Sequence, residues 1–117
     1  LLWSTSHRAA AIITKDERGI ACMDKFAVTP DAQGEGLGAA LWHYVRAMYP
    51  TLYWRARPDN PINTWYMKQA DAHVRKGDWL VFGIGFDNLG ELDDAANRCS
   101  ARPESWESLS TEQGPQQ

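Results

Sequence analysis

Short apolar runs separated by polar breaks open the chain, and this pattern is typical of β-strands joined by turns. Residues 9–14 form one run, the polar stretch 15–19 ends it, and residues 20–28 form a second run. Two such runs with a short link that ends in glycine predict a β-hairpin. In its second strand, a period of two places Cys22, Asp24, Phe26 and Val28 on one face and Met23, Lys25 and Ala27 on the other.

A helical pattern begins at Leu37 and ends before Pro50. Its apolar stripe consists of Leu37, Ala40, Leu41, Tyr44, Val45 and Met48. The stretch before the helix carries glycine at positions 34, 36 and 38. Glycines leave backbone N–H groups uncovered and a helix start carries partial positive charge, so together they can hold a phosphate group.

The rest of the pattern predicts a strand over 51–55, a short helix over 62–70 capped by Asn63, and a strand over 79–82. A terminal helix follows Asn88, with apolar residues at helical spacing up to Cys99. From about residue 103 the chain has little to bury apart from Trp106. We therefore expect one domain over 1–102 and a disordered tail over 103–117.

The composition fits a single globular domain, with 117 residues of which 44% are hydrophobic and 23% charged. No apolar run approaches the roughly 20 residues of a membrane span. We therefore expect no membrane contact. Cys22 and Cys99 lie far apart without metal-like spacing, so we expect a reduced, cytoplasmic protein without a metal. Because the first residue is not methionine, we also expect a piece of a longer protein.

The net charge of −3 is unevenly distributed. Residues 1–86 hold ten Lys or Arg against eight Asp or Glu, whereas residues 87–117 hold two against seven. The body is mildly basic, which suits an anionic cofactor or substrate. Its basic residues are too sparse for a nucleic-acid partner.

Three kinds of phosphate loop can be compared with the glycine-rich stretch. A Walker loop is excluded because Gly38 is not followed by Lys and Ser or Thr. The spacing Gly34-x-Gly36-x-x-Ala39 fits a dinucleotide fingerprint, but its acid at about 20 residues, Asp59, lies in a proline-rich loop and not at a strand end. Gln33-x-x-Gly36-x-Gly38 after a strand and a proline turn resembles the pyrophosphate loop of the Gcn5-related N-acetyltransferase (GNAT) family, which holds acetyl-CoA.

Arg55 and Arg57 end the strand predicted over 51–55, and their spacing places both on one side of an extended chain. Two guanidinium groups repel each other unless an anion lies between them, and Arg matches carboxylates well. A surface ion pair with Asp59 explains the pair equally well. For Lys25, the residues alone favour a solvated strand position.

The joint spacing of three motifs extends the resemblance from Met23 to Phe82. These motifs are Asp24-Lys25-Phe26, Gln33-Gly34-x-Gly36-x-Gly38 and Trp54-Arg55-x-Arg57-x-x-Asn60-Pro61-x-Asn63-x-x-Tyr66. Together they resemble the C-terminal acetyltransferase domain of vertebrate-type N-acetylglutamate synthases and of bifunctional bacterial N-acetylglutamate synthase/kinases. The resemblance implies an α/β (α+β) GNAT fold, with a mixed, mostly antiparallel twisted sheet flanked by helices and with further N-terminal elements before residue 1. It also implies an attached amino-acid-kinase domain and a homo-oligomer.

The resemblance implies roles for individual residues as well. Lys25, Arg55, Arg57 and Asn60 would hold the two carboxylates of L-glutamate, and Tyr66 would be the catalytic acid. Acetyl-CoA would be held by Phe26, Ala27, Val28, Gln33, Gly34, Glu35, Gly36, Leu37 and Gly38. The implied reaction is direct transfer of the acetyl group to the α-amine of glutamate, without an acyl-enzyme. The alternative is a catalytically silent module of an acetylglutamate kinase that binds acetyl-CoA for regulation or joins subunits.

Overall fold

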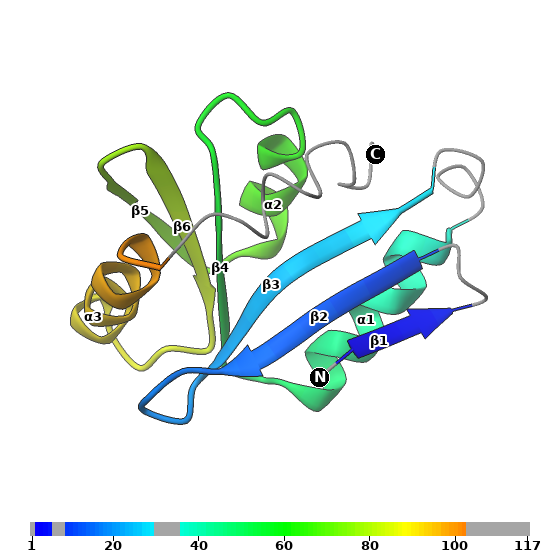
Figure 1. Ribbon diagram of the computed structural model, residues 1–117, viewed down its shortest axis with the longest axis horizontal. Helices are drawn as coiled ribbons and strands as arrows, with labels where there is room; N and C mark the ends of the chain where they lie inside the picture. The colour runs from blue at the N-terminus through cyan, green and yellow to red at the C-terminus, as the bar shows by residue number, and fades with distance from the viewer. Residues whose placement is uncertain (1, 6–8, 30–35, 103–117) are drawn as a thin grey trace.

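The computed structural model describes residues 2–5, 9–29 and 36–102. These residues form one sheet with the strand order β1-β2-β3-β4-β6-β5 and three helices (Figure 1). The strands are β1 (Leu2–Thr5), β2 (Ala9–Lys15), β3 (Ala21–Val28), β4 (Leu52–Ala56), β5 (Ala72–Lys76) and β6 (Trp79–Ile84). The helices are α1 (Leu37–Met48), α2 (Asn63–Gln69) and α3 (Leu89–Ser100). Neighbouring strands are antiparallel except β3 and β4, which confirms the expected mixed, mostly antiparallel sheet of the GNAT fold.

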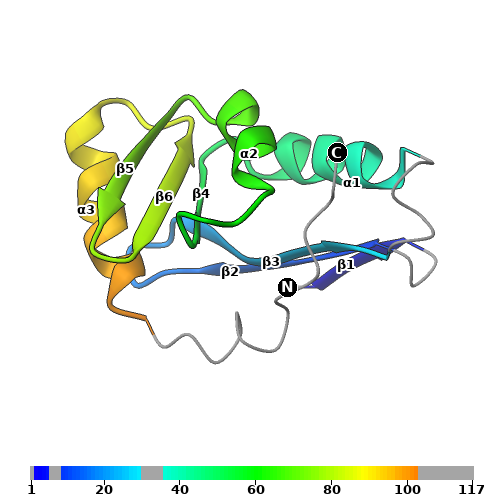
Figure 2. The ribbon, with the colours of Figure 1, turned by 90° about the horizontal axis from the view of Figure 1, so that it is seen from above.

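The helices divide the core into two clusters on opposite faces of the sheet. The first cluster joins α1 and α2 to the sheet and includes Leu41, Trp54 and Phe82. The second cluster joins α3 to the other face and includes Tyr53 and Leu92. Successive residues of a strand point to opposite faces, so the neighbours Tyr53 and Trp54 belong to different clusters. Figure 2 shows α1 and α2 on the same side of the strands. None of the described helices is long and apolar enough to cross a membrane.

β3 contains a bulge at Asp24. Ile12 of β2 pairs with Lys25, whereas the next residue, Ile13, pairs with Met23. Two residues of β2 therefore face three residues of β3, and Asp24 is the extra one. A bulge bends its strand and changes which way the following side chains point.

The bulge makes the predicted faces of this strand wrong. Met23 lies in the first core cluster together with Phe26 and Val28, while Cys22 lies in the second cluster with α3. Strict alternation would have placed Met23 opposite Phe26.

β3 and β4 are paired over three residues only, from Ala21 with Leu52 to Met23 with Trp54. Beyond these pairs the two strands diverge (Figure 1). The bulge at Asp24 directly follows the last paired residue of β3. The edge of β3 that faces β4 is therefore no longer paired with that strand, and space for a ligand opens between them.

α1 has the predicted bounds but buries a different stripe. Its buried residues are Gly38, Leu41, Trp42 and Val45. Tyr44 and Met48 are instead 47% and 50% exposed. The large Trp42 ring occupies the buried position, with its centroid 5.8 Å from that of Phe26 and 5.2 Å from that of Trp54. Burial of this ring sets the rotation of the helix.

Two strands, β1 and β5, have no counterpart in the sequence prediction. β5 is only partly buried and mostly polar, and it forms by antiparallel pairing with β6. α2 begins at Asn63, but Asn63 does not cap it. The predicted cap of α3 is confirmed, because the Asn88 side chain accepts a hydrogen bond from the backbone N–H of Glu91 at 2.9 Å.

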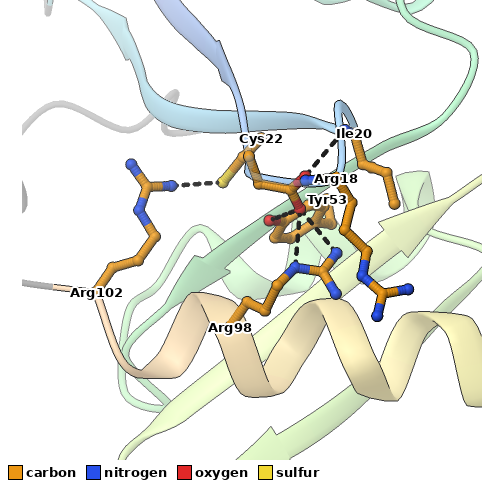
Figure 3. A network of polar contacts seen from close by, with 7 residues as sticks. Arg18, Ile20, Cys22, Tyr53, Arg98 and Arg102 are labelled. Atoms are coloured by element: carbon orange, nitrogen blue, oxygen red, sulfur yellow. Dashed lines mark hydrogen bonds and ion pairs between the residues drawn. The ribbon is translucent and has the colours of Figure 1, made fainter.

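The turn between β2 and β3 is tied to α3 through Asp16. Its Oδ2 accepts hydrogen bonds from the hydroxyl of Tyr53 at 2.6 Å and from Nη2 of Arg98 at 2.8 Å. Its Oδ1 accepts from the backbone N–H groups of Arg18 and Ile20. Figure 3 shows these four partners converging from the turn, β4 and α3. Burial alone would raise the pKa of Asp16, but the hydrogen bonds outweigh burial and lower this pKa to about 2.

Asp16→Asn is expected to destabilise the fold in a pH-dependent way. The pKa of Asp16 in the folded protein lies below its ordinary value of 3.8, so its charge stabilises the fold above about pH 4. This contribution is lost as the pH falls through about 2. Urea unfolding should therefore show a variant that is less stable than the parent at pH 6, with a difference that shrinks between pH 4 and pH 2.

Asp94→Asn is the matched control, because Asp94 is exposed on α3. Its stability should follow that of the parent at every pH. A difference between Asp16→Asn and the parent that stays constant down to pH 2 would contradict the assignment.

Candidate functional site

A cavity of about 360 Å³ lies where β3 and β4 diverge. Residues from the two strands, the loop after β4, α2 and β6 line it. They are Met23, Asp24, Lys25, Phe26, Trp54, Arg55, Ala56, Arg57, Asp59, Asn60, Pro61, Ile62, Tyr66 and Trp79. The five residues predicted to bind glutamate or to act in catalysis are all on this list, although they come from three separate segments of the chain.

Arg55 and Arg57 both stack on Trp79 of β6. Each guanidinium carbon Cζ lies 3.9 Å from the centroid of the Trp79 ring. Nη1 of Arg55 also donates to the backbone carbonyls of Cys99 at 2.7 Å and Arg102 at 3.1 Å, at the end of α3. The two arginines share one side of the chain, as predicted, and Arg55 additionally ties the cavity wall to α3.

The loop after β4 is held in a fixed turn. The backbone N–H of Asn60 donates to the carbonyl of Arg57 at 3.0 Å. The side-chain amide of Asn63 donates to the carbonyls of Arg57 at 2.8 Å and Pro58 at 3.2 Å. Oδ1 of Asn60 accepts from the N–H of Ile62 at 3.1 Å, which leaves its Nδ2 as the group that can donate to a ligand. Asn63, predicted as a helix cap, is instead the clamp of this loop.

Tyr66 lies in α2 with its ring packed among aromatic residues. Its centroid is 5.3 Å from both Trp54 and Phe82 and 5.8 Å from Trp65. Burial raises the pKa of the Tyr66 hydroxyl, so this group keeps its proton well above neutral pH. Among the described residues, no hydrogen-bond partner engages this hydroxyl. A protonated phenol at the cavity wall is suited to donate a proton to a bound molecule.

Lys25 and Asp24 reach the cavity from the bulge of β3. Lys25 is half-buried, and its ammonium is the third cationic group of the cavity. The side chain of Asp24 is only 4% exposed. Its Oδ1 accepts from Nη2 of Arg102 at 2.7 Å, and its Oδ2 accepts from the hydroxyl of Thr14 at 2.9 Å. Arg102 also donates to Sγ of Cys22 at 2.9 Å (Figure 3).

The predicted cofactor residues are only partly described. Phe26, Ala27 and Val28 are buried, and Phe26 also lines the cavity. Gln33, Gly34 and Glu35 lie outside the described residues. Gly36 directly precedes α1 with a φ of 79°, in the left-handed region that favours glycine. No side chain caps this helix start, and a Cβ atom on Gly36 would meet nothing within 4 Å.

The sequence analysis assigned no site role to Asp24, Trp79 or Arg102. Asp24 and Asn63 carried a signal, since each belongs to one of the motifs. Trp79 appeared only as the start of a strand. Tertiary packing brings Trp79 to the cavity and Arg102 to Asp24, and no local pattern indicates either contact.

Comparison with known proteins places this geometry in a family. The family model described as "NAT, N-acetyltransferase, of N-acetylglutamate synthase" matches residues 2–102. The chain is 38% identical to "N-acetylglutamate synthase, mitochondrial" of Danio rerio over 92% of its own length and 21% of the relative. It is 37% identical to "Acetylglutamate kinase" of Xanthomonas campestris over 85% of its length and 24% of the relative. It is 34% identical to the Homo sapiens "N-acetylglutamate synthase, mitochondrial" over 95% of its length and 21% of the relative.

The chain thus spans no more than about a quarter of the length of these relatives. The family model nevertheless covers the six strands, the three helices and the whole cavity. The chain therefore belongs to the N-acetyltransferase family of N-acetylglutamate synthase.

Proposed function

We propose that this domain transfers the acetyl group of acetyl-CoA to the α-amine of L-glutamate. The observation that carries the proposal is the cavity, which unites three cationic side chains, an amide donor and a protonated phenol. Binding of a coenzyme alone needs no such set. A regulatory or oligomerisation module without catalysis is therefore the weaker alternative.

The cations of the cavity suit an acceptor with two carboxylates. Arg57, directly after β4, and Lys25, on β3, both line the cavity and can each meet one carboxylate. Nδ2 of Asn60 adds a donor on a rigid turn. Nη1 of Arg55 donates to the carbonyls of Cys99 and Arg102 at the end of α3, and the side chain also lines the cavity. We propose that it both holds the cavity wall and contacts the acceptor. Charge-assisted hydrogen bonds of this kind are stronger than neutral ones.

The coenzyme seat that we propose combines the edge of β3 beyond its pairing with β4 and the start of α1. The uncapped N–H groups at the start of α1 and the open space at Gly36 fit a pyrophosphate. Gln33, Gly34, Glu35, Leu37 and Gly38 would complete this seat. When bound, acetyl-CoA supplies a thioester as the acetyl donor.

The reaction that we propose is a direct attack. The lone pair of the neutral α-amine forms a bond to the thioester carbonyl carbon, and backbone N–H groups of 26–28 stabilise the oxygen as it gains negative charge. The C=O double bond then re-forms as the carbon–sulfur bond breaks, and the electron pair of that bond leaves with sulfur. Tyr66 donates its proton to that sulfur. The nitrogen, which became positively charged on attack, gives one proton to the Tyr66 oxygen, so that a neutral amide is left and the phenol is restored.

The setting of the domain is also part of the proposal. Relatives named as kinases and synthases are at least four times longer than the matched region, which supports a larger protein with an amino-acid-kinase domain. Homo-oligomer formation and a cytoplasmic location remain predictions. Some relatives carry mitochondrial names.

Glutamate should be acetylated far better than glutamine in an assay of thiol release from acetyl-CoA. Loss of the side-chain carboxylate leaves a desolvated cation unpaired, which costs roughly 2–5 kcal/mol by analogy with truncated buried charge pairs. We expect kcat/KM to differ by on the order of 10²-fold or more. Equal turnover of the two amino acids would exclude recognition of two carboxylates, and no thiol release with either would exclude the proposed activity.

Tyr66→Phe removes the hydroxyl and keeps the ring among its aromatic neighbours. We expect kcat to fall by on the order of 10²–10⁴ while binding of both substrates changes little. Trp65→Phe is the control, because it alters the same aromatic cluster without removing the proposed acid. An unchanged kcat in Tyr66→Phe would show that Tyr66 is not the acid and that the thiolate takes its proton from water.

Gly36→Asp should abolish the rise in melting temperature that CoA causes in the parent, because a carboxylate would face the pyrophosphate. Gly19→Asp is the matched control, since Gly19 has a φ of 78° with open space around it in the β2–β3 turn. Both variants carry the same backbone strain and charge, but only Gly36→Asp should lose the response. A normal response in Gly36→Asp would place the phosphates elsewhere.

A further inference from the structure

The cavity holds carboxylates as well as cations. Lys25, Arg55 and Arg57 line it together with Asp24 and Asp59. Under the proposed function, the acceptor enters with its amine protonated at neutral pH. The three cations attract the acceptor's carboxylates but repel this ammonium. The ammonium must also lose a proton before its nitrogen can attack, so the site needs a group that holds it and accepts that proton.

Asp24 is already committed to other partners. Its two oxygens receive hydrogen bonds from Arg102 and Thr14, and its side chain is 4% exposed. Both oxygens of Asp24 are therefore already bound by protein groups, and its side chain forms part of the cavity wall.

Asp59 is in the opposite situation. It is exposed, it lines the cavity, and its side chain makes no hydrogen bond or ion pair with another described residue. The ion pair with Arg55 or Arg57 that the sequence left open is not formed. Its position is nevertheless fixed, because Asn63 and the backbone of Asn60 hold the turn on both sides of it.

We propose that Asp59 binds the acceptor's ammonium and takes its proton. The N–H bond breaks, its electron pair stays on nitrogen, and the proton forms an O–H bond with the carboxylate of Asp59. The nitrogen then attacks the thioester carbon. This role rests on the proposed function and supplies the base that the reaction needs.

The other charged and titratable groups of the cavity do not offer this chemistry. Lys25 on β3, Arg55 on β4 and Arg57 directly after β4 are cationic. Tyr66 on α2 keeps its proton because burial raises its pKa. Asp24 is paired with Arg102. Among the described residues of the cavity, Asp59 is thus the unpaired anion.

The first test is the pH dependence of kcat/KM for glutamate in the full chain. With a base that accepts the ammonium form, kcat/KM of the parent should change little between pH 7 and pH 9. The Asp59→Asn variant can use only the small fraction of glutamate whose amine is already unprotonated. Its kcat/KM should therefore be on the order of 10²-fold lower at pH 7 and should rise about tenfold per pH unit, as that fraction does. Asp59→Glu should restore a flat profile. An Asp59→Asn enzyme with the parent's rate and profile would overturn the role.

The second test needs no turnover, so it separates this inference from the proposed activity. Calorimetry compares the binding of glutamate with that of glutarate, which has both carboxylates but no amine. The parent should prefer glutamate, and Asp59→Asn should lose that preference. Asp87→Asn, at an exposed site outside the cavity, should bind like the parent. If Asp59→Asn keeps the parent's preference, Asp59 does not recognise the ammonium.

Discussion

The divergence of β3 from β4 is the constraint on which the site depends. Parallel pairing ends at Met23 and Trp54, and the bulge at Asp24 bends β3 away at the next residue. A fully paired strand would bring β3 against β4 and leave no room for a cavity. The bulge also brings Asp24 and Lys25 to the cavity wall. One extra residue thus creates the space and supplies two of the charges around it.

The aromatic core keeps the two strands apart. Trp54 on β4 stacks on Phe82 of β6, and Trp42 of α1 meets both Trp54 and Phe26. Large rigid rings fill the space behind the cavity, and a closed sheet would have to displace them. The same packing buries the ring of Tyr66, which is why its hydroxyl stays protonated. Core packing and the chemistry of the site therefore share the same side chains.

Much of the fold could be predicted from local patterns. The β2–β3 hairpin, α1 and α3 each carry strong periodicity or a cap, such as Asn88. The patterns failed where a long-range contact decides the local structure. The bulge at Asp24 is set by pairing with β2, the rotation of α1 by the burial of Trp42, and β5 by pairing with β6 despite its polar sequence.

The candidate residues of the site were identified from the spacing of three motifs. This spacing indicates which residues share a site, whereas periodicity indicates only which residues share a face of a helix or strand. Lys25, Arg55, Arg57, Asn60 and Tyr66 do meet in one cavity. The motifs could not show that Arg55 also holds two carbonyls at the end of α3, since its contact with Arg102 spans 47 residues of sequence. Nor could they show that Asp24 is paired and Asp59 is not. These differences depend on which neighbours the fold brings to each carboxylate.

The contacts of α3 have a consequence for the order in which the chain is made. Arg98 and Arg102 hold the β2–β3 turn and the bulge, and Arg55 binds the carbonyls next to them. A growing chain on the ribosome has made β3 and β4 long before it has made these two arginines. Asp24 then lacks its counter-ion, and the wall that it shares with Lys25 lacks support. The cavity can therefore be completed only after residue 102 has emerged, so the arrival of α3 sets when the cavity walls are first held in place.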